Sequence, residues 1–385
     1  SLGYTQTSYL SLIQYDSFTS VYGVSFWVPT LNVIFFQITK NWKNTKKCLA
    51  LILLVLVLFL LPWIYGKKVI PKEGQYQEKI RIALIQGNID PYVKWDENFR
   101  DLNFKTYHRL TEAAALQRPD LLVWPETATP CYLRYDFKYL EQVQSLVDEL
   151  GIPLLTGSPD FEYISSNMYH TYNSALLLLP NQSQIQSYAK LHLVPFGERV
   201  PFEDSFPFSY LKSLLDKLEL GQGDFSPGKE TVVFQFQTQG EKGSTESIKF
   251  SVVICYESIF PELVREFVVK GAQFLIIITN DAWFGKTSAP YHHAQIAIFR
   301  AIENRISIGR CANTGVSMFI DSYGRTLMAS PIFKEEVLVS DIPLRQEKTF
   351  FTRYGNVFSS AILVFNVFPL GLALLHKRTA GPGCN

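Results

Sequence analysis

The sequence predicts an α/β domain of stacked sheets and helices that is flanked by transmembrane helices. Apolar, β-branched runs such as FLIIITN alternate with amphipathic segments such as FKYLEQVQSLVDEL. Uncharged apolar runs long enough to cross a bilayer lie towards both ends of the 385-residue chain. Polar side chains also follow directly after several buried runs, which is where α/β folds place reacting groups.

Three segments are candidate membrane spans. Residues 48–65 and 357–375 contain no charged side chain, so a buried core helix is a poor alternative for either. Residues 21–39 form a weaker candidate because they contain Pro29 and Asn32. The chain lacks an initiator methionine, and we expect residues 1–65 to be a partial set of N-terminal membrane helices.

The basic residues predict an orientation for these spans. The candidate span 357–375 is followed by His376, Lys377 and Arg378. Four lysines lie in the loop between the candidate spans 21–39 and 48–65: Lys40, Lys43, Lys46 and Lys47. The positive-inside rule places both clusters in the cytoplasm, which puts residues 66–350 on the external face. Lys67, Lys68 and Lys72 argue mildly against this. Residues 376–385 are expected to be a cytoplasmic tail or a tag remnant.

Between the spans we expect a linker at residues 66–78 and a folded domain at residues 79–345. Strands are expected in 79–89, 120–126, 152–161, 173–180, 183–195, 225–237, 248–257, 274–280, 307–321 and 324–330. The segments 173–180 and 183–195 are expected to pair. Helices are expected in 99–117, 137–150, 260–271 and 292–305. Gly271 is expected to cap the third of these helices.

Composition excludes several classes of function. A formal charge of +1, with 18% charged residues, gives no sign of the excess positive charge that nucleic-acid-binding proteins carry. The chain has no GxGxxG or Walker loop, so we expect no nucleotide cofactor. His292 and His293 are adjacent and cannot face one another on a helix, so we expect no metal site. Five cysteines do not indicate a disulfide framework, and the sequence leaves open whether Cys131 and Cys311 pair.

Three polar residues could perform nucleophilic chemistry together. Cys255 ends the buried run FSVVI before a helix start, Glu126 ends DLLVWPE, and Lys190 lies in SYAKLHLVP. A thiol nucleophile needs a base to take its proton and a cation to stabilise the oxyanion that forms, and Glu126 and Lys190 could serve as these. Taken singly, each has an ordinary alternative: a core cysteine, a turn cap and a surface cation.

The motifs WPE, AKLHLVPFGE and CYE, in this order, resemble the Glu-Lys-Cys signature of the nitrilase superfamily. Five longer motifs are similar to those of its membrane branch, the apolipoprotein N-acyltransferases: GNI(x)5W, WPET, KLHLVPFGERVP, ICYESIFPE and TNDAWFG. The resemblance extends from about Gly23 to the last apolar segment. It implies a four-layer α-β-β-α sandwich, a feature that periodicity alone does not specify.

The resemblance also implies roles for residues around the three. Glu198 would support Lys190 or its loop, and Glu257 would support the loop of Cys255, although a structural salt bridge is an alternative for both. Tyr256 could line an acyl pocket or simply pack. Trp95 matches a tryptophan of a mobile arm over the site, or is one more core aromatic. Trp283 and Phe284, on a loop with Gly285, could form a lipid-facing lid or cover the sheet.

The expected reaction is acyl transfer from a membrane phospholipid, through a thioester on Cys255, to the N-terminal amine of an apolipoprotein's diacylglyceryl-cysteine. The substrates follow from the resemblance, whereas nucleophilic acyl chemistry follows from the residues. We expect a multi-pass monomer in the bacterial inner membrane. One alternative is an amidase or nitrilase acting on a small substrate, and another is a membrane-anchored binding scaffold without catalysis.

Overall fold

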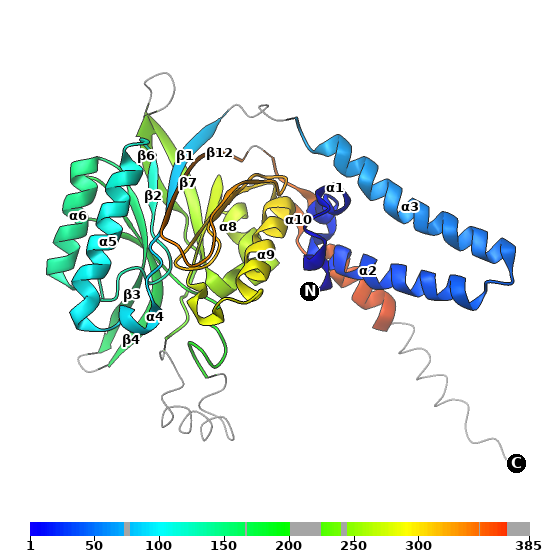
Figure 1. The fold of residues 1–385 in the computed structure, drawn as a ribbon, viewed down its shortest axis with the longest axis horizontal. Coiled ribbons are helices and arrows are strands. Elements are labelled where there is room, and N and C mark those ends of the chain that lie inside the picture. The colour runs from blue at the N-terminus through cyan, green and yellow to red at the C-terminus, as the bar shows by residue number, and fades with distance from the viewer. Residues whose placement is uncertain (73–77, 166–167, 201–224, 240–244, 346, 368–385) are drawn as a thin grey trace, which may run out of the picture. The chain divides into compact units, whose positions relative to one another are not determined.

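The computed structural model describes residues 1–72, 78–165, 168–200, 225–239, 245–345 and 347–367 (Figure 1). The chain forms two compact units. The first unit combines Ser1–Glu73 with Ile302–Arg305 and Glu347–Asn385. The second combines Gly74–Ala301 with Ile306–Gln346, and it contains every strand described below.

The first sheet of the second unit has the strand order β12-β1-β2-β3-β4-β5. β1, β2 and β3 run parallel, whereas β12 pairs antiparallel with β1, and β4 pairs antiparallel with both β3 and β5. The last of these pairings joins the two segments that were expected to pair. The strands are β1 (Lys79–Gln86), β2 (Leu121–Val123), β3 (Leu154–Ser165), β4 (Met168–Leu178), β5 (Gln186–Ala189) and β12 (Glu336–Pro343).

The second sheet repeats this plan with the order β11-β10-β9-β8-β7-β6. Its centre is again parallel, with β7, β8 and β9 side by side, and its edges are antiparallel. β8 is buried along its whole length, which explains why its sequence is a continuous apolar run. The strands are β6 (Phe234–Gln239), β7 (Thr245–Ile254), β8 (Phe274–Thr279), β9 (Ser307–Ala312), β10 (Met318–Ile320) and β11 (Thr326–Ala329).

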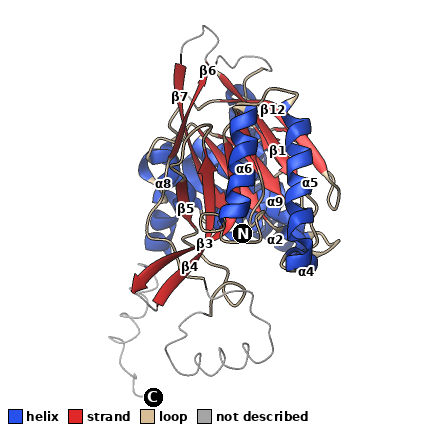
Figure 2. Ribbon diagram, turned by 90° about the vertical axis from the view of Figure 1, so that its left-hand side faces the viewer, coloured by secondary structure: helices blue, strands red, loops and turns tan. Residues whose placement is uncertain are grey.

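Helices cover the outer faces of the two sheets (Figures 1 and 2). α5 (Glu97–Ala115) and α6 (Phe137–Leu150) lie on the first sheet, and α8 (Pro261–Val269) and α9 (Ala289–Asn304) lie on the side of the second. The inner faces of the sheets pack together, with β1 against β9. The four layers confirm the expected α-β-β-α sandwich.

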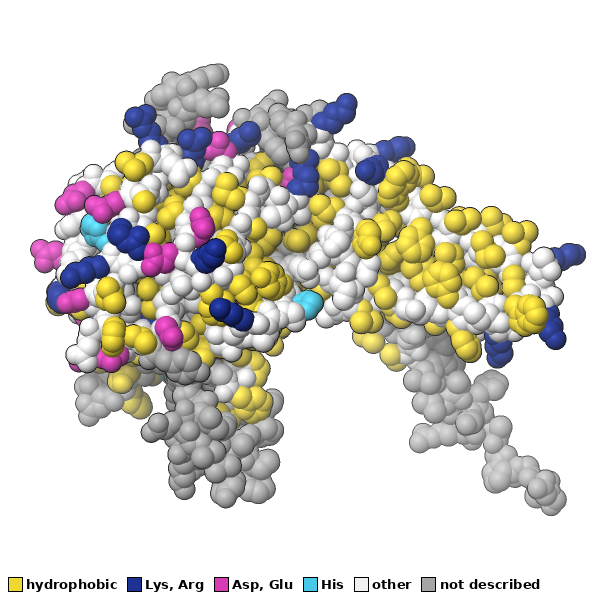
Figure 3. All heavy atoms as spheres, viewed as in Figure 1, with side chains coloured by type: hydrophobic (Ala, Val, Ile, Leu, Met, Phe, Trp, Pro, Cys, Tyr) yellow, Lys and Arg dark blue, Asp and Glu magenta, His cyan; other side chains and the backbone are white. Residues whose placement is uncertain are grey.

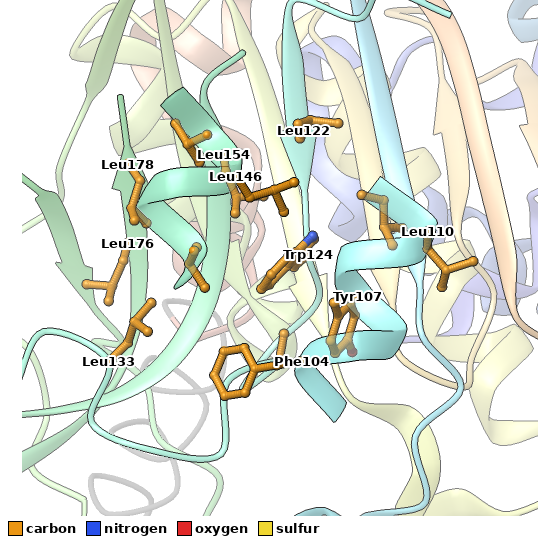
Figure 4. Close-up of a cluster of buried hydrophobic side chains, with 14 of the residues drawn as sticks. Phe104, Tyr107, Leu110, Leu122, Trp124, Leu133, Leu146, Leu154, Leu176 and Leu178 are labelled. Atoms are coloured by element: carbon orange, nitrogen blue, oxygen red, sulfur yellow. The ribbon is translucent and has the colours of Figure 1, made fainter. Parts of the chain in front are cut away.

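The core between the first sheet and its helices is aromatic and aliphatic (Figure 4). The ring of Tyr107 stacks on Trp124 with centroids 4.9 Å apart, and Phe104 stacks on Tyr139 at 4.4 Å. Trp124 also donates from its indole nitrogen to Thr111 Oγ1 at 2.9 Å, so its polar atom is satisfied in the core. Because Trp124 lies two residues before Glu126, this packing fixes the strand end that carries the glutamate.

The first unit contains two helices that are long and apolar enough to cross a membrane, α2 (Asp16–Lys40) and α3 (Thr45–Val69). Hydrophobic side chains cover their visible face, and lysines gather where α2 turns into α3 (Figure 3). α2 is kinked at Ser20, where φ is 55°, so its regular second part matches the expected span 21–39. The short elements of this unit are η1 (Leu2–Gln6), α1 (Leu10–Ile13) and α10 (Phe350–Tyr354).

The structure differs from the sequence-based boundaries in several places. β6 begins at Phe234 and not at residue 225, and the expected strand 307–321 is divided between β9 and β10. α3 continues to Val69, into the expected linker 66–78, despite Pro62 and Gly66 within it, and Ile70 is the first residue with extended backbone. Residues 357–367 form an apolar helix, whereas the rest of the expected span 357–375 and the tail 376–385 lie outside the described residues. β12 was not expected from the sequence.

Candidate functional site

The candidate residues follow strands of both sheets. Glu126 lies three residues after the end of β2, Lys190 directly follows β5, and Cys255 directly follows β7. Asp281 lies two residues after β8. β7 and β8 run parallel, so Cys255 and Asp281 lie at the same edge of the second sheet.

The Glu126 carboxylate is held by three donors. Its side chain is buried, with 6% of the residue exposed. Oε1 accepts from Asn173 Nδ2 at 2.8 Å and from Lys190 Nζ at 3.3 Å. Oε2 accepts from the backbone N–H of Asn280, in the second sheet, at 2.8 Å. The carboxylate therefore has a fixed orientation at the junction of the two sheets.

Lys190 lies between two carboxylates. Its Nζ donates to Glu198 Oε1 at 2.8 Å as well as to Glu126, and the residue is 1% exposed. Burial alone would lower the pKa of Lys190, but the charges of Glu126 and Glu198 raise it above its ordinary value. The two carboxylates therefore favour the charged form of Lys190 inside the site.

Cys255 sits at a sharp turn between β7 and a short 3-10 helix, η2 (Cys255–Ile259). Its φ of 51° lies in the left-handed region, which a non-glycine residue adopts only when its surroundings impose it. Burial and the charge of Glu126 raise the pKa of its thiol, while Lys190 acts in the opposite direction. The thiol therefore rests in its protonated form and needs a base before it can attack.

Glu257 joins the turn of Cys255 to the loop of Lys190. Its Oε1 accepts from the backbone N–H of Leu191 at 2.7 Å and from Tyr188 Oη at 2.7 Å, and its Oε2 accepts from Ile254 N at 2.8 Å. The side chain is fully buried, and burial raises its pKa. The support that we expected Glu257 to give to the loop of Cys255 thus extends to the segment of Lys190.

A second charged cluster lies behind the thiol. Asp281 Oδ1 lies 2.8 Å from His293 Nδ1, and its Oδ2 accepts from Arg310 Nη2 at 2.7 Å. His293 Nε2 lies 3.2 Å from the backbone carbonyl oxygen of Cys255. Burial opposes ionisation of Asp281, but Arg310 and His293 outweigh it and lower the pKa of that carboxyl. His293 thus has carboxylate, guanidinium and carbonyl partners.

Comparison with known proteins identifies the family. The carbon-nitrogen hydrolase family model matches residues 81–349. An apolipoprotein N-acyltransferase of Geobacter metallireducens is 39% identical over 383 residues, which cover 98% of this chain and 70% of the relative. A second apolipoprotein N-acyltransferase, of Chlorobaculum tepidum, is 35% identical over 396 residues, covering 98% and 73%. The chain belongs to the apolipoprotein N-acyltransferase family.

Among solved structures, the nitrilase-superfamily protein Nit3 of Saccharomyces cerevisiae is similar at a TM-score of 0.49 and 20% identity, covering 69% of this chain and 90% of that protein.

The other residues suggested by the resemblance to the N-acyltransferase family lie in different surroundings. Glu198 belongs to the cluster, because its Oε1 accepts from both Lys190 and Asn173. Tyr256 is half-buried and packs edge-on against Phe260 at 5.3 Å. Trp95 is 47% exposed, so it is not a core aromatic. Trp283 and Phe284, in η3 (Asp281–Phe284), are each 45% exposed.

Sequence reasoning about the N-acyltransferase motifs missed two buried residues that contact Glu126. Asn173, on β4, donates from Nδ2 to both Glu126 and Glu198. Lys94, the last residue of α4 (Pro91–Lys94), donates to Thr127 Oγ1 at 2.8 Å. No local signal marks Asn173, whereas the motif GNI(x)5W includes Lys94 directly before its tryptophan.

The two cysteines whose pairing the sequence left open are both free and buried. Cys311 Sγ donates to the backbone carbonyls of Ile85 and Val123 in the first sheet, at 3.5 and 3.4 Å. Cys131 lies in the core beneath α5 and α6. Both act as small core residues in this member of the family.

Proposed function

We propose that this chain transfers an acyl chain from a membrane phospholipid, through a thioester on Cys255, to the N-terminal amine of an apolipoprotein's diacylglyceryl-cysteine. The names of its relatives support the lipoprotein acceptor. The observation that carries the chemistry is the single cluster in which Glu126 accepts from Lys190 Nζ and from the N–H of Asn280, which directly follows β8 beside the strand that ends at Cys255.

In the first half-reaction, Cys255 Sγ attacks the ester carbonyl carbon while Glu126 takes the thiol proton. Lys190 faces the oxygen on which negative charge develops, and its fixed cation stabilises the tetrahedral intermediate. The ester C–O bond then breaks, and Glu126 returns the proton to the departing lysophospholipid oxygen. The carbonyl carbon is now bonded to sulfur.

In the second half-reaction, the acceptor amine attacks the thioester carbon. A C–N bond forms, the C–S bond breaks, and Glu126 moves the amine proton to the departing sulfur. Two substrates that share one covalent intermediate require ping-pong kinetics. Glu198 and Asn173 support this cycle because their hydrogen bonds hold the side chains of Lys190 and Glu126 in place.

The membrane setting follows from α2 and α3 together with the chemistry of the substrates. Both substrates lie in a lipid leaflet, so an enzyme anchored beside it meets them without extracting them into water. We place the folded domain on the external face of the bacterial inner membrane, because the lysines between α2 and α3 favour the cytoplasm. The exposed Trp95, Trp283 and Phe284 are candidates for contact with lipid.

The test uses the detergent-solubilised chain and phosphatidylethanolamine with a tagged acyl chain. The tag should appear on the protein, be released by neutral hydroxylamine, and be absent from Cys255→Ala. Cys131→Ala is the matched control, because Cys131 is a buried thiol of the core and should leave labelling intact. Absence of the tag from folded parent protein, or equal labelling of Cys255→Ala, contradicts the proposal.

A further inference from the structure

Lys94 is a buried lysine beside the Glu126–Thr127 turn. The residue is 1% exposed, and its Nζ donates to Thr127 Oγ1 at 2.8 Å and, at 3.4 Å, to the backbone carbonyl of Glu126. Within the described part of the chain, no carboxylate lies within ion-pair distance of this Nζ. Burial lowers the pKa of Lys94 to about 7, although the charge of Glu126 acts in the opposite direction. An arrangement this unfavourable for stability suggests a functional reason.

The turn that Lys94 contacts is strained. Thr127 has a φ of 47°, which is an outlier for a β-branched residue. On its other side the turn lies against Gly157 of β3. A Cβ added to Gly157 would lie 2.5 Å from Thr127 N and 2.6 Å from Glu126 Cα. The Glu126–Thr127 backbone is therefore held between the Gly157 backbone and the Lys94 ammonium.

Lys94 is itself anchored. Asn103 of α5 donates from Nδ2 to the Lys94 carbonyl at 3.1 Å, which ties the end of α4 to the helix layer. The chain continues directly to the exposed Trp95. The Lys94 side chain thus connects a helix-anchored segment to the backbone of Glu126.

We propose that Lys94 is a positioning residue for Glu126: its bond to Thr127 holds the strained turn so that the Glu126 carboxylate faces the Cys255 thiol. This rests on the proposed function only in taking Glu126 as the base. Lys94 is buried behind the turn and does not touch the ester, so it acts on the chemical step and not on substrate binding.

The test is the acylation of Cys255 by p-nitrophenyl butyrate, a small activated ester that needs no bilayer. The change is Lys94→Met, which keeps side-chain length and removes the charge and its donors. We expect the acylation rate at saturating ester to fall about tenfold and KM to stay unchanged. A positioned general base contributes roughly a hundred- to ten-thousand-fold to the rate, and misplacing Glu126 should remove a part of that contribution. Lys105→Met, at an exposed lysine of α5, is the control and should match the parent.

Thr127→Val removes the partner atom and keeps the shape of the side chain. It should lower the rate by a similar factor, and the double variant Lys94→Met/Thr127→Val should be no slower than the slower single variant. If Lys94→Met fails to fold, as its melting temperature reports, Thr127→Val alone decides. The proposal is overturned if the acylation rate of the deciding single variant is unchanged, or if only KM changes. It is also overturned if the rate losses of Lys94→Met and Thr127→Val multiply in the double variant.

The small ester separates this proposal from the proposed function. If the parent is acylated by p-nitrophenyl butyrate but not by phosphatidylethanolamine, the phospholipid donor is wrong and Lys94 is still judged by its variants. If Lys94→Met matches the parent with both donors, only the role of Lys94 is wrong. If neither the ester nor phosphatidylethanolamine acylates Cys255 in the folded parent, both proposals are overturned together.

Discussion

The Cys255 thiol lies between two opposing charges, and this determines how single substitutions should act. After burial, the charge of Glu126 is the main influence that raises its pKa, and Lys190 lowers it. A residue that only tuned the thiol would move reactivity and catalysis in the same direction. Glu126 is both the proposed base and a nearby negative charge. Its removal should therefore raise the reactivity of the thiol and lower the rate of acyl transfer.

Glu126→Gln tests this difference. Removal of the carboxylate takes away the main charge that raises the thiol pKa and leaves Lys190 paired with Glu198, so the thiol pKa should fall and alkylation of Cys255 by iodoacetamide at neutral pH should become faster. Acyl-enzyme formation should fall roughly hundred- to ten-thousand-fold, because no base remains to move the proton. Alkylation is followed by mass spectrometry over a pH series, with the parent curve lying at higher pH than that of the variant.

The control for this pair of measurements is Glu112→Gln, on the exposed face of α5, which should leave both rates unchanged. Slower alkylation of Cys255 in Glu126→Gln would contradict the assigned electrostatics. Unimpaired acylation would remove Glu126 from the mechanism.

At the residue scale, the sequence predicted the site residues that follow apolar runs. It did not predict site residues whose position depends on how two strands pair. Glu126 and Cys255 come directly after buried runs, so their placement at strand ends could be read locally. Asn173 lies inside β4, and the β4–β5 pairing places it opposite Lys190, whose N–H donates to the Asn173 carbonyl. Nothing in the sequence around Asn173 encodes that register.

At the element scale, the contact of β3 with the turn after β2 controls the site. Gly157→Ala should displace the Glu126 backbone, since the new Cβ would meet backbone atoms that cannot rotate away. We expect acyl-enzyme formation to be nearly lost and the free energy of unfolding to fall by about 1–3 kcal/mol. Urea unfolding and hydroxylamine-sensitive labelling measure the two effects.

Gly151→Ala is the matched comparison. Gly151 caps α6 with a φ of +66° and has no neighbouring atom within 4 Å of an added Cβ. Alanine there should lower stability by about 1–2 kcal/mol through backbone strain and leave labelling intact. If both variants lose stability equally and keep activity, the turn is not sensitive to β3.

The elements that the sequence predicted are those with strong local periodicity. α6 was expected at residues 137–150 and occupies Phe137–Leu150, where Asp136 caps its start and Gly151 its end. β12 was missed because its run EVLVSDIP becomes polar at Ser340 and Asp341. It is a strand because its backbone pairs with β1, a partner far away in the sequence.

At the scale of the whole molecule, the loop between α2 and α3 should lie on the opposite side of the membrane from the folded domain. In a Cys48→Ser/Cys255→Ser/Cys384→Ser background, Asn44→Cys should resist a membrane-impermeant maleimide in intact spheroplasts and react after lysis. Ser183→Cys, exposed between β4 and β5, should react in both conditions. The reverse pattern would place the domain in the cytoplasm and contradict the proposed localisation.

The proposed base and cation belong to one sheet and the thiol to the other, and the two layers are joined by packing and a few bonds such as Asn280 N to Glu126. Each sheet keeps its own ladder of hydrogen bonds if the layers slip slightly against each other. Proton transfer tolerates no such slip, because it needs donor and acceptor within hydrogen-bond reach. During gentle denaturation, turnover should therefore disappear while the strands are still intact, which makes catalysis an early reporter of loosening between the layers.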